Sequence, residues 1–443
     1  MPDKRPHERT AERSAEDPKN RTTRKAGTMG ALSRRNVLAG GAIATAAALG
    51  VSACGRSGGG TRTAGGDGKP VGGASWGATP SASPVNLIGD GSMADTGPQP
   101  NQPAPQRLAP GQRPPQFVVF SWDGAGEDSK QLFSHFRSVA QEVKATMSFF
   151  LSGIYVLPEG KKDIYLPPGH KPGASDIGYL ADNHVKATLE QVRQAWLEGH
   201  EIGTHFNGHF CSPGTGVGTW TPTQWRSELE QAIGFVEKWK TNTGFHDMDP
   251  LPFDYRKELI GGRTPCLLGQ KQLLPTAAAM GWKYDASSPG GLQMWPTKKL
   301  GLWDFPLQSI PFPGHSFQVL SMDYNMLANQ TGGTPNGDPS KRPYWQQQSY
   351  AAYMAGFNRA YTTNRAPFFI GNHFESWNGG IYMKSVERAL REIAAKPDVQ
   401  LVSFRQLVQW LEVQDPAVLA KLRTLNVGQK PNDWKEYTTP QVV

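Results

Sequence analysis

Cysteine is scarce in this chain, and its scarcity limits the chemistry that the sequence can support. The 443 residues include three cysteines, Cys54, Cys211 and Cys266, and no two of them form a CxxC pair. The sequence therefore gives no indication of a zinc site built from cysteines. It also shows no internal repeat, so a repeat architecture is not expected.

The chain after residue 53 has little net charge. The formal net charge is +8, and residues 1–35 alone hold ten Lys and Arg against five Asp and Glu. Residues 36–53 carry no charge, so the chain after residue 53 has a net charge of only +3. A balance this close to neutral gives no electrostatic reason to expect nucleic-acid binding.

An uncharged segment near the N-terminus has the layout of an export signal. "SRRNVLAGG" places two arginines directly before it, and "VSAC" ends it with small residues before Cys54. Residues 1–53 are therefore predicted to be an N-terminal extension with a twin-arginine lipoprotein signal, starting at Met1 or Met29. The prediction implies diacylglycerol on the Cys54 sulfur and anchoring to the outer face of the bacterial cytoplasmic membrane. A membrane-spanning anchor is the alternative, because 18 uncharged residues are nearly long enough to cross a bilayer.

The composition divides the rest of the chain into three parts. Gly, Pro, Ser and Gln dominate residues 54–114, so a disordered linker is predicted there. Apolar runs begin at Phe117, and residues 115–415 are predicted to form the functional domain. The C-terminal tail, residues 416–443, gives no indication of function.

Short apolar runs alternate with helical segments after Phe117, which is typical of α/β folds. Strands are expected at "FVVFSW", "TMSFFL", "HEIGTH", "GWKYDAS", "FQVLSMD", "APFFIGNH" and "VQLVSF". Helices are expected over 188–199, with Thr188 and Gln191 as a capping box, over "TPTQWRSELEQAIGFVEKWK", with Thr221 as the cap, and over "SVERALREIAAK". One α/β domain with polar residues at its strand ends fits a distorted (β/α) barrel. The Pro- and Gly-rich segment 157–183 is expected to be a loop on the substrate side.

Polar residues with metal and acid–base chemistry follow two of these strands. Asp123 ends the first strand, in "FVVFSWDGAGED", and His205 and His209 follow "HEIGT" four residues apart. Two imidazoles at that spacing can bind one metal ion, and two histidines with a carboxylate form a common open zinc site. The spacing alone is weakly specific.

Five segments together carry a more specific pattern. They are "SWDGA", "GHEIGTHFNGH", "GGRTPC", "WKYDASS" and "APFFIGNHF". In order and approximate spacing they resemble the five motifs of the polysaccharide deacetylases of the NodB-homology group, carbohydrate esterase family four. The chitin-deacetylase-like branch is the most similar, because "RTPCLLGQKQLLPTAAAMGWKYDAS" and "LWDFP" also follow its pattern. The resemblance covers about residues 115–412 and implies the distorted barrel of that family.

The resemblance implies a divalent metal, with zinc expected, on His205 and His209. The metal would bind the attacking water and the acetamide oxygen, lowering the pKa of the water from about 15.7 toward about 7. Asp123 would be the general base that takes the proton of the water. Arg263 would hold that base in its charged form.

The resemblance also implies a general acid. His373 would protonate the leaving amine, and Asp285 would fix the tautomer of His373. Aromatic residues could offer stacking faces to a sugar or belong to the core, and those considered are Trp295, Trp303 and Trp377.

Glycine at position 124 departs from the family pattern. The first motif of the family has a second aspartate at this position, which is the third metal ligand. Three alternatives remain open for this chain: Asp123 moves onto the metal, Glu127 or Asp128 reaches back to it, or the two histidines bind metal weakly. Loss of the metal would remove about 12 kcal/mol of stabilisation of the ionised water, which an aspartate base cannot replace.

The implied reaction is hydrolysis of N-acetyl groups on an extracellular amino-sugar polymer, such as peptidoglycan or a chitin-like glycan, to acetate and free amine. A degenerate relative that binds N-acetylated sugars without hydrolysing them is the alternative that Gly124 suggests, and an O-acetyl ester hydrolase is a third. The chain is expected to act as a monomer on an N-acetylated polysaccharide. Cys211 and Cys266 either form a disulfide in an oxidising compartment or remain two free buried thiols.

Overall fold

The computed structural model of the protein describes residues 86–440. The expected signal at residues 1–53, the lipidation site Cys54 and the first part of the predicted linker lie outside the described residues. The strands are β1 Asn86–Ile88, β2 Met93–Asp95, β3 Gln116–Asp123, β4 Ser148–Leu151, β5 Glu201–Thr204, β6 Tyr284–Asp285, β7 Pro289–Gly291, β8 Thr297–Lys299, β9 Leu302–Asp304, β10 Leu307–Pro311, β11 Gln318–Leu320, β12 Phe368–His373 and β13 Val399–Leu401.

Helices connect most of these strands. They are α1 Leu132–Glu142, α2 Asp182–Leu197, α3 Pro222–Glu237, α4 Trp239–Thr243, α5 Tyr255–Glu258, α6 Gln270–Ala279, α7 Asp323–Thr331, α8 Arg342–Tyr361, α9 Trp377–Ala394, α10 Phe404–Val413, α11 Pro416–Leu422 and α12 Lys435–Thr438. No helix within residues 86–440 combines the length and the apolar character needed to cross a membrane.

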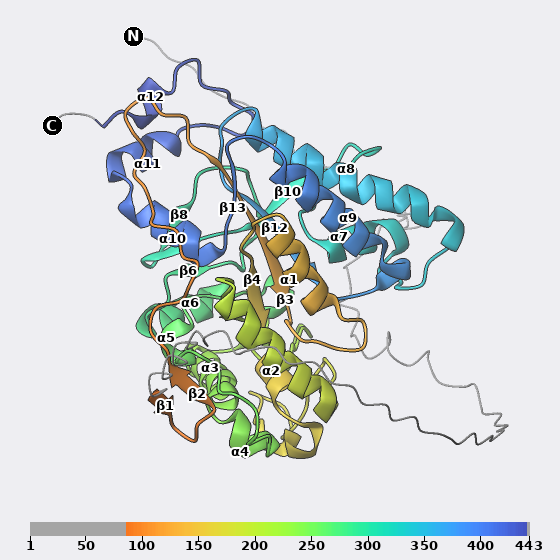
Figure 1. Ribbon diagram of the computed structural model, residues 1–443. Helices are drawn as coiled ribbons and strands as arrows, with labels where there is room; N and C mark the ends of the chain where they lie inside the picture. The colour runs from red at the N-terminus through yellow and green to blue at the C-terminus, as the bar shows by residue number, and fades with distance from the viewer. Residues whose placement is uncertain (1–85, 441–443) are drawn as a thin grey trace, which may run out of the picture. The chain divides into compact units, whose positions relative to one another are not determined.

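Five parallel strands form the central sheet (Figure 1). Their order is β12-β3-β4-β5, and β13 pairs with the first part of β3. The register sets His373 of β12 opposite Asp123 of β3, and Thr204 of β5 opposite Leu151 of β4. The carboxyl ends of the strands therefore meet at one edge of the sheet, where residues that follow the strands gather.

Backbone hydrogen bonds continue the strand arrangement beyond β5 and return it to β12. The successive bonds run from Arg263 N to Thr204 O, Ala286 N to Gly262 O, Phe305 N to Asp285 O, Ser321 N to Gln308 O and Gly371 N to Ser321 O, each 2.9–3.0 Å long. Because Phe305 and Pro306 join β9 directly to β10, these bonds complete a circuit. The expected α/β fold with a distorted barrel is confirmed, and the irregular half is the one that follows β5.

The two sides of β3 face different apolar cores. Val118, Phe120 and Trp122 belong to the larger core, which also contains buried residues of α1 and α9. Phe117 and Val119 belong to the second core, together with the barrel aromatics Phe150, Tyr284, Phe305 and Phe369. Since side chains alternate along a strand, Asp123 continues the face of Phe117 and Val119 and points into the barrel.

The helix starts show where local sequence rules hold and where they fail. Helix α3 begins as predicted, with Thr221 and Gln224 forming a reciprocal capping box. Helix α2 begins at Asp182 instead, and Thr188 lies inside it. The predicted cap at Thr188 is wrong, because its hydroxyl accepts a hydrogen bond from the backbone N–H of Glu127 at 2.8 Å.

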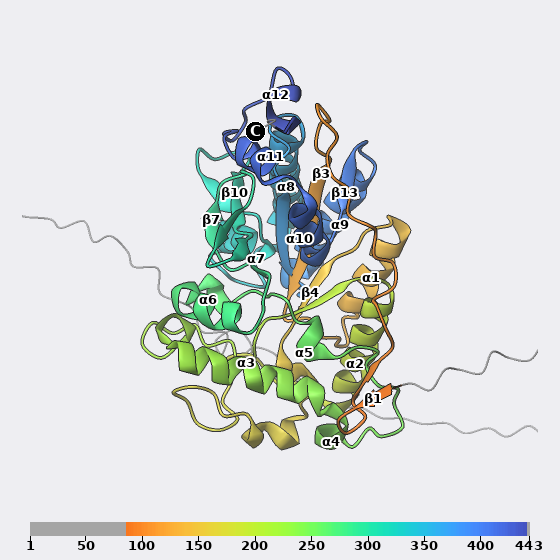
Figure 2. The same cartoon turned by 90° about the vertical axis from the view of Figure 1, so that its left-hand side faces the viewer.

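Helices support the sheet at both ends. Helices α8 and α9 lie side by side (Figure 1), and α8 also contacts β10 and β12. Helix α3 packs against α6 (Figure 2) and against η2, a single 3-10 turn over Gly153–Val156 that follows β4. Helix α3 therefore supports the segments next to the carboxyl end of β4.

The folded region extends beyond both predicted domain boundaries. The predicted linker ended at residue 114, yet residues 86–114 contact the domain, for example through Trp239 Nε1, which donates to Ser92 O at 2.6 Å. The predicted tail 416–443 contains α11 and α12, and its residues Val418, Leu419 and Leu422 are buried in the second core. The first segment is mostly polar, yet its Met93 and Ala94 are buried against the domain, so its attachment depends on contacts that composition does not show.

Candidate active site

Four of the predicted site residues come from the carboxyl ends of neighbouring strands. Asp123 ends β3 and His373 ends β12, directly opposite each other in register. His205 follows the last residue of β5, and Arg263 lies on the adjoining segment, where its backbone N–H donates to Thr204 O at 3.0 Å. The parallel arrangement thus brings together residues that are far apart in the sequence.

Arg263 holds Asp123 in its ionised form. Nη1 of Arg263 lies 2.8 Å from Asp123 Oδ1 and also donates to Ser121 Oγ at 2.9 Å. The side chains of Arg263 and Asp123 are 0% and 3% exposed. Burial alone raises the pKa of Asp123, but the charge of Arg263, with further contributions from His205 and His373, brings this pKa below its ordinary value. The carboxylate is therefore charged and able to accept a proton, as the predicted general base requires.

His205 and His209 lie next to each other, with ring centroids 5.0 Å apart. Nδ1 of His205 is 2.8 Å from the backbone oxygen of Arg263. An imidazole that donates to a carbonyl from one nitrogen keeps its lone pair on the other, which is the usual arrangement of a metal-binding histidine. His209 has φ 57°, a left-handed conformation that costs about 1–3 kcal/mol in a non-glycine residue. The turn after β5 is therefore strained into the shape that brings His209 back beside His205.

A buried hydrogen-bond network that sequence reasoning did not predict holds this turn. Glu228 of α3 accepts from Asn207 N and from the Tyr165 hydroxyl, each at 3.0 Å, and the Tyr165 oxygen accepts from Gly208 N at 3.0 Å. Burial raises the pKa of Glu228 to about 7, even though these hydrogen bonds lower it. Because Tyr165 belongs to segment 157–183, the predicted substrate-side loop is tied to the histidine turn.

The ring partner of His373 is Asp323. Oδ1 of Asp323 lies 2.8 Å from His373 Nδ1, and Oδ2 accepts from the backbone N–H of His373 at 2.8 Å. A carboxylate on Nδ1 keeps a proton on that nitrogen and leaves Nε2 as the nitrogen that can exchange a proton. Asp323 is fully buried, so both contacts are shielded from water.

The predicted contact between Asp285 and His373 is not formed. Asp285 lies on β6, which pairs with β9, and its carboxylate accepts from the Ser287 hydroxyl. Burial raises the pKa of Asp285 to about 6. The backbone bridge between Met322 and Gly371 explains the difference, because it brings Asp323 to the end of β12, within hydrogen-bond distance of His373.

The acidic residues that follow Gly124 do not complete a metal site. Glu127 Oε2 accepts from Ser134 N at 2.7 Å, at the start of α1. Asp128 lies at the cavity with Lys130, 3.0 Å away. Within residues 86–440, three ligand atoms of His, Cys, Asp or Glu lie within 4.8 Å of one another only in the set His209, Cys211 and Cys266. Neither Asp123 nor a neighbouring acidic residue therefore lies close enough to both histidines to bind the same ion with them.

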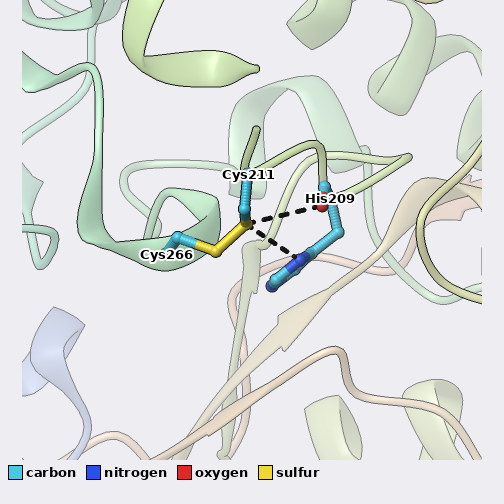
Figure 3. Close-up of side chains that lie close together, drawn as sticks. All are labelled: His209, Cys211 and Cys266. Atoms are coloured by element: carbon cyan, nitrogen blue, oxygen red, sulfur yellow. Dashed lines mark hydrogen bonds between the residues drawn. A yellow bond between two sulfur atoms is a disulfide. The ribbon is translucent and has the colours of Figure 1, made fainter. Parts of the chain in front are cut away.

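Cys211 and Cys266 form a disulfide (Figure 3). The alternative of two free thiols is therefore wrong. The sulfur atoms of a disulfide are not thiolates, and thiolates are the form in which cysteine binds metals. The bridge instead has a structural effect, since Cys211 Sγ lies 3.5 Å from His209 Nδ1 and ties the histidine turn to the segment after Arg263.

The site residues line one cavity of about 60 Å³. Asp123, His205, His209 and His373 contribute to its wall, and segment 157–183 contributes Ile177 and Leu180. A volume of this size accommodates a few water-sized groups. A group of a few non-hydrogen atoms would therefore fill it.

Aromatic side chains that do not line the cavity lie beside His373. The ring of Trp377 is 5.6 Å from that of His373, and Tyr324, which is 40% exposed, packs edge-on against Trp377. Of the three aromatic residues considered, Trp377 is therefore the one that lies beside a site residue. Trp295 and Trp303 are instead 2% and 3% exposed in the second core, so for them the core alternative is correct.

Comparisons with known proteins give weak similarities. No protein-family model matches the chain, and no curated protein is significantly similar to it. A protein of Mycobacterium smegmatis described as a polysaccharide deacetylase is 16% identical, with a TM-score of 0.41, over 70% of this chain and 95% of that one. The peptidoglycan deacetylase PdaC of Bacillus subtilis is 10% identical, with a TM-score of 0.34, over 67% and 92%. A CE4 esterase of Streptococcus mutans is 14% identical, with a TM-score of 0.36, over 65% and 86%. Values this low leave the function to be judged from the site itself.

Proposed function

We propose that this protein is a metal-dependent deacetylase that hydrolyses N-acetyl groups of an extracellular amino-sugar polymer. The observation that supports this most is the pairing of a charged carboxylate, Asp123, with an imidazole, His373, at a small cavity that His205 and His209 also line. Amide hydrolysis needs one group that accepts the proton of the attacking water and another that protonates the leaving amine. Asp123 and His373 suit these two roles.

Each of the two groups is prepared by a neighbour. Arg263 lowers the pKa of Asp123, so this carboxylate is ionised at neutral pH and can take the proton of the water. Asp323 binds Nδ1 of His373, so its charge stabilises the imidazolium from which Nε2 gives a proton to the amine nitrogen. The water oxygen bonds to the carbonyl carbon, the C–N bond breaks, and acetate and a free amine result.

The donor groups at the cavity fit a divalent metal ion, and zinc is the ion we expect. His205 and His209 would hold it, since the carbonyl of Arg263 fixes the tautomer of His205 and both rings line the cavity. A divalent ion bound there lowers the pKa of the attacking water toward about 7 and polarises the carbonyl group of the substrate.

Export and lipid anchoring belong to the same proposal. A lipid on Cys54 would hold the domain at the outer face of the bacterial cytoplasmic membrane, where peptidoglycan or a chitin-like glycan is the substrate. The support is the signal-like sequence of residues 1–53. We propose that the protein acts there as a monomer.

A sugar-binding protein without activity is the second candidate, and Gly124 is the observation that favours it. Without a third ligand, the cavity could still receive an N-acetyl group while Trp377 and Tyr324 contact the sugar. An O-acetyl ester hydrolase is a variant of the first candidate, because the same attack on a carbonyl cleaves an ester.

Acetate release from N-acetylated oligosaccharides tests the proposal. Asp123→Asn should lower kcat by roughly 10²–10⁴-fold, the usual contribution of an acid–base group. Asp128→Asn, at the same cavity, is the matched control and should keep most of the activity. Acetate release from O-acetylated sugars alone would assign the esterase. Sugar binding by calorimetry without release of acetate would assign the binding protein.

A further inference from the structure

A tyrosine occupies the space beside Gly124. Gly124 has φ +68°, and a Cβ added there would lie 3.6 Å from Cε2 and 3.8 Å from the hydroxyl oxygen of Tyr155. The Tyr155 phenol therefore lies directly beside the place where a side chain at position 124 would begin. Gly124 and Tyr155 both line the cavity, so the phenol supplies an oxygen at a part of the wall where position 124 supplies no side-chain oxygen.

Gly126 shows that this part of the chain is fitted to the tyrosine ring. A Cβ at Gly126 would lie 2.7 Å from Cδ2 of Tyr155, closer than real Cβ atoms approach, and 3.2 Å from Cε2. The ring edge thus runs from Gly126 to Gly124, with the hydroxyl at the Gly124 end. Glycine at position 126 therefore makes room for the ring, whereas a Cβ at position 124 would only touch the ring at ordinary van der Waals distance.

The strand order places Tyr155 between Asp123 on one side and His205 and His209 on the other. Strand β4 lies between β3, which ends at Asp123, and β5, which precedes His205. Tyr155 belongs to η2, directly after β4, and η2 is fixed to the histidine turn because Gly153 N donates to Phe206 O at 2.7 Å. The phenol therefore enters the cavity wall at the same edge as both histidines.

Ser152 gives a second, independent indication that a ligand binds at this place. Its side chain is fully buried and lines the cavity, with Oγ 3.7 Å from the Cβ position of Gly124. Within residues 86–440 this oxygen has no hydrogen-bond partner. A buried hydroxyl left in that state costs about 1–3 kcal/mol, which a bound group would offset.

We propose that the phenol of Tyr155 is the third protein ligand of the divalent ion held by His205 and His209, with the Ser152 hydroxyl left to donate to a group bound at the same cavity. The inference rests on the proposed function, and it removes the conflict that Gly124 raises. The oxygen–metal bond forms as the phenol loses its proton to solvent, because metal ligands bind in their deprotonated form. A phenolate carries the same single negative charge as the carboxylate that it replaces, so the charge of the site is kept.

Zinc titration by calorimetry of the metal-stripped, full-length protein tests this ligand. Titrations in buffers of different ionisation enthalpy give both the affinity and the number of protons released. Tyr155→Phe should bind zinc at least roughly 100-fold more weakly, since losing even a residue that supports a ligand costs about 10–100-fold. It should also release one proton fewer. Tyr179→Phe is the matched control, because the Tyr179 hydroxyl donates to Gly173 O and Tyr179 does not line the cavity.

Two further measurements identify the ligand atom directly. Loading the protein with a ferric or cupric ion should produce a phenolate-to-metal charge-transfer absorption in the visible range, and Tyr155→Phe should lack it. The double variant Gly124→Asp, Tyr155→Phe should regain tight zinc binding. The left-handed backbone at position 124 would strain an aspartate by about 1–3 kcal/mol, but its Cβ would make only ordinary contacts at 3.6–3.8 Å.

The outcomes separate this inference from the proposed function. Tight zinc binding by the unmodified protein, with equal affinity and proton release in Tyr155→Phe, would overturn the role of Tyr155 and leave the deacetylase proposal standing. No zinc binding by the unmodified protein would refute the metal-dependent function itself, and the ligand with it. Weak zinc binding by Tyr155→Phe together with an unchanged midpoint of thermal unfolding would support the inference.

Discussion

Replacing Glu228 by glutamine is expected to flatten the pH dependence of the stability of this protein. Glu228 is fully buried, and burial raises the pKa of its carboxyl group from 4.5 to about 7. The folded chain therefore binds this proton more tightly than the unfolded chain does. Its contribution to stability is fully present below about pH 4.5 and is lost as the pH rises through about 7.

The pKa difference sets the size of the effect. The difference is about 2.5, and each pKa unit corresponds to about 1.4 kcal/mol, so the full loss is about 3 kcal/mol. Roughly 2–3 kcal/mol of it should appear between about pH 5 and pH 8. A typical free energy of unfolding is about 5–15 kcal/mol, so the loss is measurable. Glutamine has no proton to lose in this range and can still accept from Asn207 N, so the variant should lack this component.

Urea unfolding of the full chain at about pH 5 and pH 8 measures the effect. The unmodified protein should lose more stability between the two values than Glu228→Gln does, by the amount above. Glu230→Gln is the control on the same helix, because the Glu230 side chain is 39% exposed in ion pairs with Arg226 and Arg256. Exposed ion pairs contribute about 0–1 kcal/mol, so this variant should keep the unmodified pH dependence. Equal pH dependence in Glu228→Gln and the unmodified protein would refute the raised pKa.

Three shorter predictions concern the groups around the cavity. Asp323→Asn should lower kcat on acetylated oligosaccharides by roughly 100-fold or more with little change in KM, because an amide does not stabilise the His373 imidazolium; an unchanged kcat would contradict this. Arg263→Gln should raise the pKa of Asp123 and move the acid limb of the pH–rate profile to higher pH. The variant should also lower the free energy of unfolding by about 3–5 kcal/mol, because the buried Asp123 charge loses its partner. An acid limb at unchanged pH would contradict the effect of Arg263 on the pKa of Asp123. Cys211→Ser should cost about 4 kcal/mol in urea unfolding, the chain-entropy value for a separation of 55 residues, and equal stability would argue against the bridge.

Part of the site could be predicted from the sequence because each residue involved follows a recognisable local element. Asp123 ends the apolar strand β3, and His205 and His209 follow β5. Parallel strands bring such ends together, so the predicted neighbourhood of Asp123, His205 and His373 needed no knowledge of the loops. The capping box of α3 was predictable for the same reason, since its two residues contact only each other.

The rest of the site depends on contacts that local patterns do not specify. Asp323 ends the apolar stretch "FQVLSM", the same pattern that drew attention to Asp123, so it could have been considered. Its choice over Asp285 depends on the bridge between Met322 and Gly371, which only the fold supplies. The Glu228 network joins three distant segments, and Thr188 has the sequence of a helix cap while making a tertiary contact. Local rules fail at these places because the polar groups are satisfied by partners far along the chain.

Position 124 shows why a missing motif residue has to be judged together with its spatial neighbours. Taken alone, glycine there means one metal ligand fewer and favours a protein that binds sugars without hydrolysing them. The Tyr155 phenol lies directly beside position 124, however, and the buried Ser152 hydroxyl lies near the same place. A Cβ at Gly126 would lie 2.7 Å from the Tyr155 ring, so the chain there is also shaped around that ring. The three features together therefore favour replacement of a ligand over loss of the site, and the zinc affinity of Tyr155→Phe decides between the two.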